Sequence, residues 1–186
     1  MRPEPRYVEP RPGEVYLSRE ELAARVGELG AEIGRDYAER DLLLVTVLKG
    51  AFVFAADLAR AVPIPHAMDF LDLASYGGGA PGERSRIRLL KDLEQPIAGR
   101  DVLLIENVVD TGLTLNYVVR TLGLRSPADI AVCTLFDRPY RRLVDDLPMR
   151  YVGFTIPDEF FLGYGFDLHE RYRGLPDLHV TEEQAP

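Results

Sequence analysis

The order of apolar and polar residues along the chain predicts strands that alternate with helices. Three largely apolar runs, at residues 42–47, 102–105 and 129–136, are short and are typical of parallel strands buried on both faces. Residues 18–37 instead keep apolar side chains at helical spacing, and Ser18 with Glu21 forms a capping box at the start of this segment. The pattern therefore predicts an α/β protein.

Helical patterns also follow the first two of these runs, at residues 51–61 and 113–122. A strand, a helix and a second strand in succession favour a right-handed crossover, which makes the two strands parallel in one sheet. Further strands are predicted at residues 68–73, 87–90 and 151–156. We therefore expect a central parallel sheet of about five strands flanked by helices.

Three segments lack this periodicity. Residues 75–86 are rich in Gly and connect two predicted strands, which favours a mobile loop of the kind that closes over a site. Residues 1–17 are rich in Pro, and residues 157–186 combine aromatic side chains with Gly, so both segments are expected to be irregular. We expect one domain over residues 1–186, with a core of about 18–156 and a small hood formed by both chain ends.

Composition narrows the classes of function. The 186 residues carry a formal net charge of −8, which argues against nonspecific binding to nucleic acid. No apolar run approaches the roughly 20 residues of a membrane span, and the N-terminus has no signal-peptide pattern. The single Cys133 excludes an internal disulfide and fits a reducing cytoplasm. His66, His169 and His179 do not have the spacing of metal ligands. From the charge, the hydropathy and the cysteine content together, we expect a cytoplasmic protein without a membrane or nucleic-acid partner.

The segment that follows the central apolar run carries the clearest chemical pattern. Glu106 stands at the predicted end of the strand, and residues 110–114 (Asp-Thr-Gly-Leu-Thr) precede the next helical pattern. A backbone that turns there can direct several N–H groups, two hydroxyls and the positive end of a helix dipole at one phosphate. No Gly-Lys-Ser/Thr closes the loop, which excludes a Walker motif. An acidic turn without a ligand is the alternative.

Polar residues also follow two other buried strands. Lys49 and Gly50 end the first, and Arg138 follows the third. Because the carboxyl ends of parallel strands meet at one edge of a sheet, these residues and Glu106 are expected to face the same crevice.

The central motif resembles the phosphoribosyl-diphosphate-binding motif of the type I phosphoribosyltransferases, in which two acidic and two apolar residues precede Asp-Thr-Gly-x-Thr. Residues 47–52, 75–77, 91–93 and 156–165 then follow the order of the hypoxanthine-guanine phosphoribosyltransferases of purine salvage. The resemblance implies the type I phosphoribosyltransferase fold and Mg²⁺ as cofactor. It implies transfer of the phosphoribosyl group from phosphoribosyl diphosphate to N9 of hypoxanthine or guanine. The products are then a purine nucleotide, IMP or GMP, and pyrophosphate, and the assembly is a homodimer or homotetramer.

The same resemblance assigns the phosphate loop. It implies that Asp110 is the general base at purine N7. Because Asp is a weak base in water, a closed, desolvated site would have to raise the pKa of Asp110, or Asp110 would act chiefly as an oriented hydrogen-bond acceptor. The residues implied to hold the 5′-phosphate, largely through backbone N–H groups, are Asp110, Thr111, Gly112, Leu113 and Thr114.

Other residues are implied to bind metal and the leaving group. Glu106 would bind the ribose hydroxyls and Mg²⁺, and Asp167 would bind a second Mg²⁺. Lys49 and Gly50 lie where the family uses a cis peptide to expose N–H groups to pyrophosphate. Arg173 would meet the departing pyrophosphate.

The remaining assignments concern the purine and the lid. Ser75 and Tyr76 would lie on the loop that closes over the reacting centre and excludes water. Phe160 would stack on the purine, main-chain groups of Phe161 would contact its edge, and Arg138 would contact O6.

Two residues depart from the family pattern. Asn107 stands where the family has a second acidic residue, so an amide would contact the ribose with one charge fewer. Arg138 stands where the family has Lys, and this exchange is not conservative because a planar guanidinium can contact O6 and N7 together.

Other interpretations stay open at this stage. The chain could be a nucleotide-binding regulator with weak or no catalysis, or an enzyme that prefers xanthine. A nucleic-acid-binding regulator would need a basic face or an added helix-turn-helix. Asp167 and Arg173 could form a surface ion pair, Phe160 and Phe161 could belong to a hydrophobic cover, and Glu106 without a metal could cap a helix.

Overall fold

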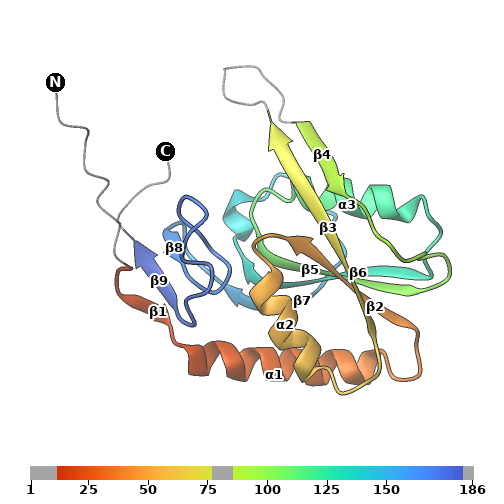
Figure 1. Ribbon diagram of the computed structural model, residues 1–186, viewed down its shortest axis with the longest axis horizontal. Helices are drawn as coiled ribbons and strands as arrows, with labels where there is room; N and C mark the ends of the chain where they lie inside the picture. Colours follow the sequence, from red (N-terminus) through yellow and green to blue (C-terminus); the bar gives the residue numbers. More distant parts are fainter. Residues whose placement is uncertain (1–11, 77–85, 182–186) are drawn as a thin grey trace.

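A six-stranded sheet forms the centre of the computed structural model, which describes residues 12–76 and 86–181 (Figure 1). Its strand order is β4-β3-β2-β5-β6-β7, and every neighbouring pair is parallel except β3 and β4. The predicted α/β fold with a mostly parallel sheet is therefore confirmed, with one more strand than expected. The strands are β2 (Leu42–Leu48), β3 (Ala67–Tyr76), β4 (Arg86–Lys91), β5 (Asp101–Val109), β6 (Asp129–Asp137) and β7 (Met149–Thr155).

Helices cover both faces of this sheet (Figure 1). On one face α1 (Arg19–Asp36) and α2 (Phe52–Ala61) pack against β2, β5 and β6, and on the other face α3 (Leu113–Gly123) packs against the same strands. Because β5 is central, its side chains are buried on both faces, as its unbroken apolar sequence predicted. No helix in residues 12–76 and 86–181 combines the length and apolar character that crossing a bilayer requires.

The first helix forms as its sequence predicts. The Ser18 side chain accepts a hydrogen bond from the backbone N–H of Glu21, and the Glu21 carboxylate accepts one from the backbone N–H of Ser18 at 2.9 Å. This capping box satisfies N–H groups that the first turn leaves unpaired. The predicted apolar face is buried throughout: Leu22, Val26, Leu29, Ile33 and Tyr37.

Two strand ends differ from the prediction. Strand β3 continues to Tyr76, because its last residues pair with β4 in an antiparallel hairpin. Strand β5 continues to Val109, because Glu106, Val108 and Val109 still pair with β6, so the predicted end at Glu106 is wrong. Ser75 and Tyr76 close β3, and the rest of the predicted lid, residues 77–85, lies outside the described residues.

The hood contains a second sheet. It has three antiparallel strands in the order β1-β9-β8 and lies beside the start of α1 (Figure 1). The prediction of irregular structure after residue 156 is wrong for two of its segments, which are too short to show a period. The strands are β1 (Val15–Leu17), β8 (Phe160–Leu162) and β9 (Leu178–Thr181).

Candidate active site

The carboxyl ends of β2 and β5 border a cavity of about 400 Å³. Its position is the one expected for a ligand in an open parallel sheet. The cavity brings together the last residues of these two strands, the loop that follows β5 and the start of α3. Its lining residues are Val47, Leu48, Leu73, Glu106, Val108, Val109, Asp110, Thr111, Gly112, Thr114 and Leu115.

The phosphate loop turns into α3 at Gly112. This residue has φ +79°, a left-handed conformation that favours glycine, and it is the N-cap of α3. The first hydrogen bond of the helix joins Asn116 N–H to the Gly112 carbonyl at 2.9 Å, so the N–H groups of the preceding turn have no partner within the helix. N–H groups in this position, together with the positive end of a helix dipole, are able to bind an anion.

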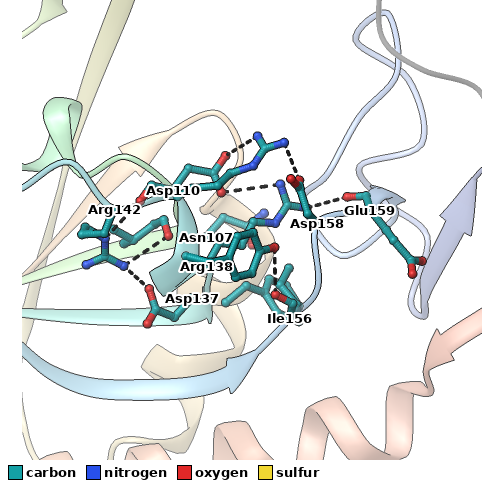
Figure 2. Close-up of polar contacts among 12 residues, drawn as sticks. Asn107, Asp110, Asp137, Arg138, Arg142, Ile156, Asp158 and Glu159 are labelled. Carbon is teal, nitrogen blue, oxygen red and sulfur yellow. Dashed lines mark hydrogen bonds and ion pairs between the residues drawn. The ribbon is translucent and has the colours of Figure 1, made fainter.

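The carbonyl groups of the same loop are held from behind by residues after β6. Arg142 Nε donates to the Asp110 carbonyl at 3.0 Å, and Leu143 N–H donates to the Thr111 carbonyl at 3.0 Å. Arg142 is itself held by an ion pair with Asp137 (Figure 2). The loop therefore keeps its carbonyl groups bonded to protein. Sequence reasoning missed Arg142, for which the only signal was its position shortly after a buried strand.

Glu106 lines the cavity as predicted. Its carboxylate accepts one hydrogen bond, from the backbone N–H of Asn107 at 3.2 Å. Burial raises its pKa from the usual 4.5 to about 8, and that hydrogen bond lowers it only in part. At neutral pH the ligand-free protein therefore holds this carboxyl mainly in its protonated form.

This raised pKa predicts a pH-dependent stability. Between about pH 4.5 and 8 the folded state binds more protons than the unfolded state, so the free energy of unfolding should fall as the pH rises. Glu106→Gln should make this slope less negative by up to about 1.4 kcal/mol per pH unit, as expected for one proton. Urea unfolding at pH 5, 6, 7 and 8 measures the slope. Replacing the exposed Glu20 by Gln is the control, and equal slopes in the two variants would contradict the assignment.

Asn107 lies on the opposite face of β5 from Glu106. Side chains alternate along a strand, so Asn107 points toward the face that α1 and α2 cover, and it does not line the cavity. The Asn107 side chain is 3% exposed and lies between Gly50 and Gly165. A methyl group added to Gly50 would lie 3.5 Å from Asn107 Cβ, and one added to Gly165 would lie 3.1 Å from Asn107 Nδ2. Asn107 Oδ1 is buried and has no hydrogen-bond partner among the residues that the structure describes. The predicted contact between Asn107 and the ribose is not what this geometry favours.

Two arginines approach the Asp110 carboxylate. Arg138 Nη1 lies 3.5 Å from Asp110 Oδ1, and Arg141 Nη1 lies 3.9 Å from Oδ2. The Arg138 side chain is almost fully buried and donates from Nη2 to the Glu159 carbonyl at 2.7 Å (Figure 2). Its guanidinium lies 5.6 Å from the centre of the Phe161 ring. Its Nε is buried, and no group in residues 12–76 or 86–181 forms a hydrogen bond with it. Arg138 therefore lies beside Asp110, but neither Arg138 nor Lys49 is among the residues that line the cavity.

A network of charged residues lies at the end of β2 and contains Lys49, Asp167, Glu170 and Arg173. The Leu48–Lys49 peptide is cis, and Lys49 Nζ forms an ion pair with Glu170 at 3.1 Å. Arg173 forms ion pairs with Glu170 at 3.3 Å and with Asp167 at 2.8 Å. The Asp167–Arg173 ion pair, which the sequence left open as an alternative, is therefore present. Hydrogen bonds from Lys49 and Arg173 lower the pKa of Glu170, a residue that sequence reasoning missed.

The two phenylalanines of β8 differ in exposure. Phe160 is 42% exposed, whereas Phe161 is buried. The Phe161 ring packs 5.1 Å from the ring of Tyr16 and 6.0 Å from that of Phe166. Phe161 therefore belongs to a hydrophobic cover, and Phe160 is free to contact a ligand.

The geometry can be compared with known proteins. The family model described as "Phosphoribosyl transferase domain" matches residues 14–169. The chain belongs to the phosphoribosyltransferase family. This phosphoribosyltransferase is 47% identical over 165 residues to the hypoxanthine phosphoribosyltransferase of Salmonella typhimurium, a match that covers 88% of this chain and 92% of that one. It is also 47% identical to the hypoxanthine-guanine phosphoribosyltransferase of Mycobacterium avium over 177 residues, or 92% and 86% of the two chains.

A solved structure gives the same result for the fold. The crystal structure of a hypoxanthine phosphoribosyltransferase from Staphylococcus aureus superposes on this phosphoribosyltransferase with a TM-score of 0.86 and 38% identity. The match covers 92% of each chain. The predicted type I phosphoribosyltransferase fold is therefore confirmed.

Proposed function

We propose that this phosphoribosyltransferase transfers the phosphoribosyl group of phosphoribosyl diphosphate to N9 of hypoxanthine or guanine. The observation that carries the proposal is the place of Asp110. Its backbone lines the cavity with the start of α3, and its carboxylate lies 3.5 Å from Arg138 Nη1. A purine placed against Asp110 would lie next to a ribose whose 5′-phosphate occupies the loop.

In this proposal Asp110 accepts the proton of purine N7 while N9 bonds to C1 of the ribose and the C1–oxygen bond to pyrophosphate breaks. The guanidinium of the buried Arg138 donates to O6 of the base. Phe160 stacks on the ring, and main-chain groups of Phe161 contact its edge. Thr111, Gly112, Leu113 and Thr114 hold the 5′-phosphate through backbone N–H groups.

The leaving group is proposed to meet the network beside β2. Lys49 and Gly50 offer backbone N–H groups to pyrophosphate. Arg173 offers a guanidinium whose Nε has no hydrogen-bond partner in the described part of the chain. Asn107 is retained only as a support of Gly50, because its side chain does not line the cavity. Ser75 and Tyr76 are proposed to carry the lid that excludes water.

Enzymes of this family generally use Mg²⁺. The described part of the chain has no cluster of three or more His, Cys, Asp or Glu side chains that could hold a metal by itself. Mg²⁺ is commonly held by one or two carboxylates together with water and substrate phosphates, and Glu106 at the cavity fits that pattern. When bound with the substrate, Mg²⁺ would neutralise diphosphate charge. At Asp167 a metal would share a carboxylate whose two oxygens already contact Arg173 and the Glu170 N–H.

A pyrophosphate-release assay with four bases, each with and without Mg²⁺, tests the proposal. Hypoxanthine and guanine should be turned over only with Mg²⁺. Adenine should not be turned over, because its 6-amino group is a donor where the Arg138 guanidinium needs an acceptor. Fastest turnover with xanthine would favour the xanthine enzyme instead, and no release with any base would favour the regulator. The cytoplasmic location and the homodimer or homotetramer stay predictions.

A further inference from the structure

The short turn after β6 is bonded to the segment that leads into β8. This turn, the 3-10 helix η1 (Pro139–Arg141), follows Arg138 directly. The Tyr140 hydroxyl donates to the Ile156 carbonyl at 3.1 Å, and Arg138 Nη2 donates to the Glu159 carbonyl at 2.7 Å. Arg141 Nη2 forms an ion pair with Asp158 (Figure 2). Three side chains from residues 138–141 therefore hold residues 156–159, the segment just before Phe160.

The same turn also reaches Asp110. Arg138 lies 3.5 Å from one carboxylate oxygen of Asp110, and Arg141 lies 3.9 Å from the other. Arg141 thus has one end of its guanidinium at Asp110 and the other at Asp158, and Arg141 N–H donates to the Arg138 carbonyl at 3.0 Å. A planar guanidinium can bridge two carboxylates in this way, whereas an ammonium is a single point charge.

We propose that Arg141 is a positioning residue that fixes the Asp110 carboxylate relative to the segment carrying Phe160. The inference rests on the proposed function, because in that proposal the purine contacts both Asp110 and Phe160. Arg141 is about as exposed as an ordinary surface arginine, with 42% of its side chain accessible, and it does not line the cavity. It would therefore act through the two carboxylates that it contacts, Asp110 and Asp158.

Steady-state kinetics of Arg141→Met, Asp158→Asn and the double variant test this inference. Arg141→Met should raise KM for hypoxanthine about three- to fivefold, the range of one exposed ion pair, and should leave KM for phosphoribosyl diphosphate unchanged. The double variant should be no worse than Arg141→Met, because residues that act as one unit are not additive. Arg141→Lys should recover only part of the loss, since one ammonium cannot bridge both carboxylates.

Arg125→Met is the matched control. Arg125 also forms an exposed ion pair, with Asp92 at 2.8 Å, but it lies outside the cavity and should change neither KM. An Arg141→Met protein with the purine KM of the control, equal changes in both KM values, or fully additive variants would overturn the inference alone. Absence of turnover in the unsubstituted protein would overturn the proposed function and this inference with it.

Discussion

Replacing Asp110 by asparagine should lower kcat with hypoxanthine by about 10²–10⁴-fold, the usual effect of losing a general base. The amide has nearly the same shape, so it keeps the hydrogen-bonding position but cannot accept the proton. Binding of ribose 5-phosphate should change little, because the backbone N–H groups of the loop remain and Arg142 still holds the Asp110 carbonyl. Steady-state kinetics and calorimetric titration with ribose 5-phosphate measure the two quantities.

Asp146→Asn provides the control for this substitution, since Asp146 is an exposed aspartate between β6 and β7. It removes the same charge without touching the cavity and should leave kcat unchanged. Unaltered turnover in Asp110→Asn would remove Asp110 from the mechanism. Equal losses of turnover and of ribose 5-phosphate binding would instead give it a purely structural role in the loop.

Gly165→Ala should abolish most activity by separating two loops of the site. Gly165 has φ +98°, and a methyl group there would lie 2.1 Å from the Gly50 carbonyl oxygen, so backbone has to move. The left-handed conformation costs about 1–2 kcal/mol for a residue with a side chain, and forcing extra volume into a packed site costs about 1–3 kcal/mol more. If about half of this cost falls on the displacement of Gly50 from pyrophosphate, kcat/KM for phosphoribosyl diphosphate falls about five- to seventyfold.

Gly99→Ala separates the two causes. Gly99 also has positive φ, +75°, but a methyl group there meets nothing within 4 Å. It should lose about 1–2 kcal/mol of stability from the left-handed conformation and keep its kinetics. Urea unfolding and kinetics of both variants give the comparison. Gly165→Ala with the kinetics of Gly99→Ala would show that the approach of Gly165 to Gly50 has no bearing on the site.

The main sheet and the phosphate loop could be predicted because their signals are local. An apolar run, a capping box and the Asp-Thr-Gly-Leu-Thr segment each predict a local structure from only a few neighbouring residues. The error at β5 came from ending the strand at its first acidic residue. Extending it by three residues places Glu106 and Asn107 on opposite faces by strand alternation alone, so the orientation of Asn107 was predictable in principle.

The support of the site could not be read in this way, because it depends on contacts between distant residues. Arg142 holds a carbonyl 32 positions earlier, and Lys49 pairs with Glu170, 121 positions later. A surface-like Arg or Glu gives no signal of such a partner. The short strands of the hood, three or four residues long, were missed because no period can be seen over that length.

Product analysis of one reaction mixture tests the central claim most directly. The protein is incubated with hypoxanthine, phosphoribosyl diphosphate and Mg²⁺, and the products are identified by ¹H and ³¹P NMR. The account predicts many turnovers, with IMP linked at N9 and pyrophosphate formed in equal amounts. The account would be contradicted if the protein binds purine nucleotides but forms no more IMP and pyrophosphate than a mixture without protein. The chain would then be a nucleotide-binding regulator.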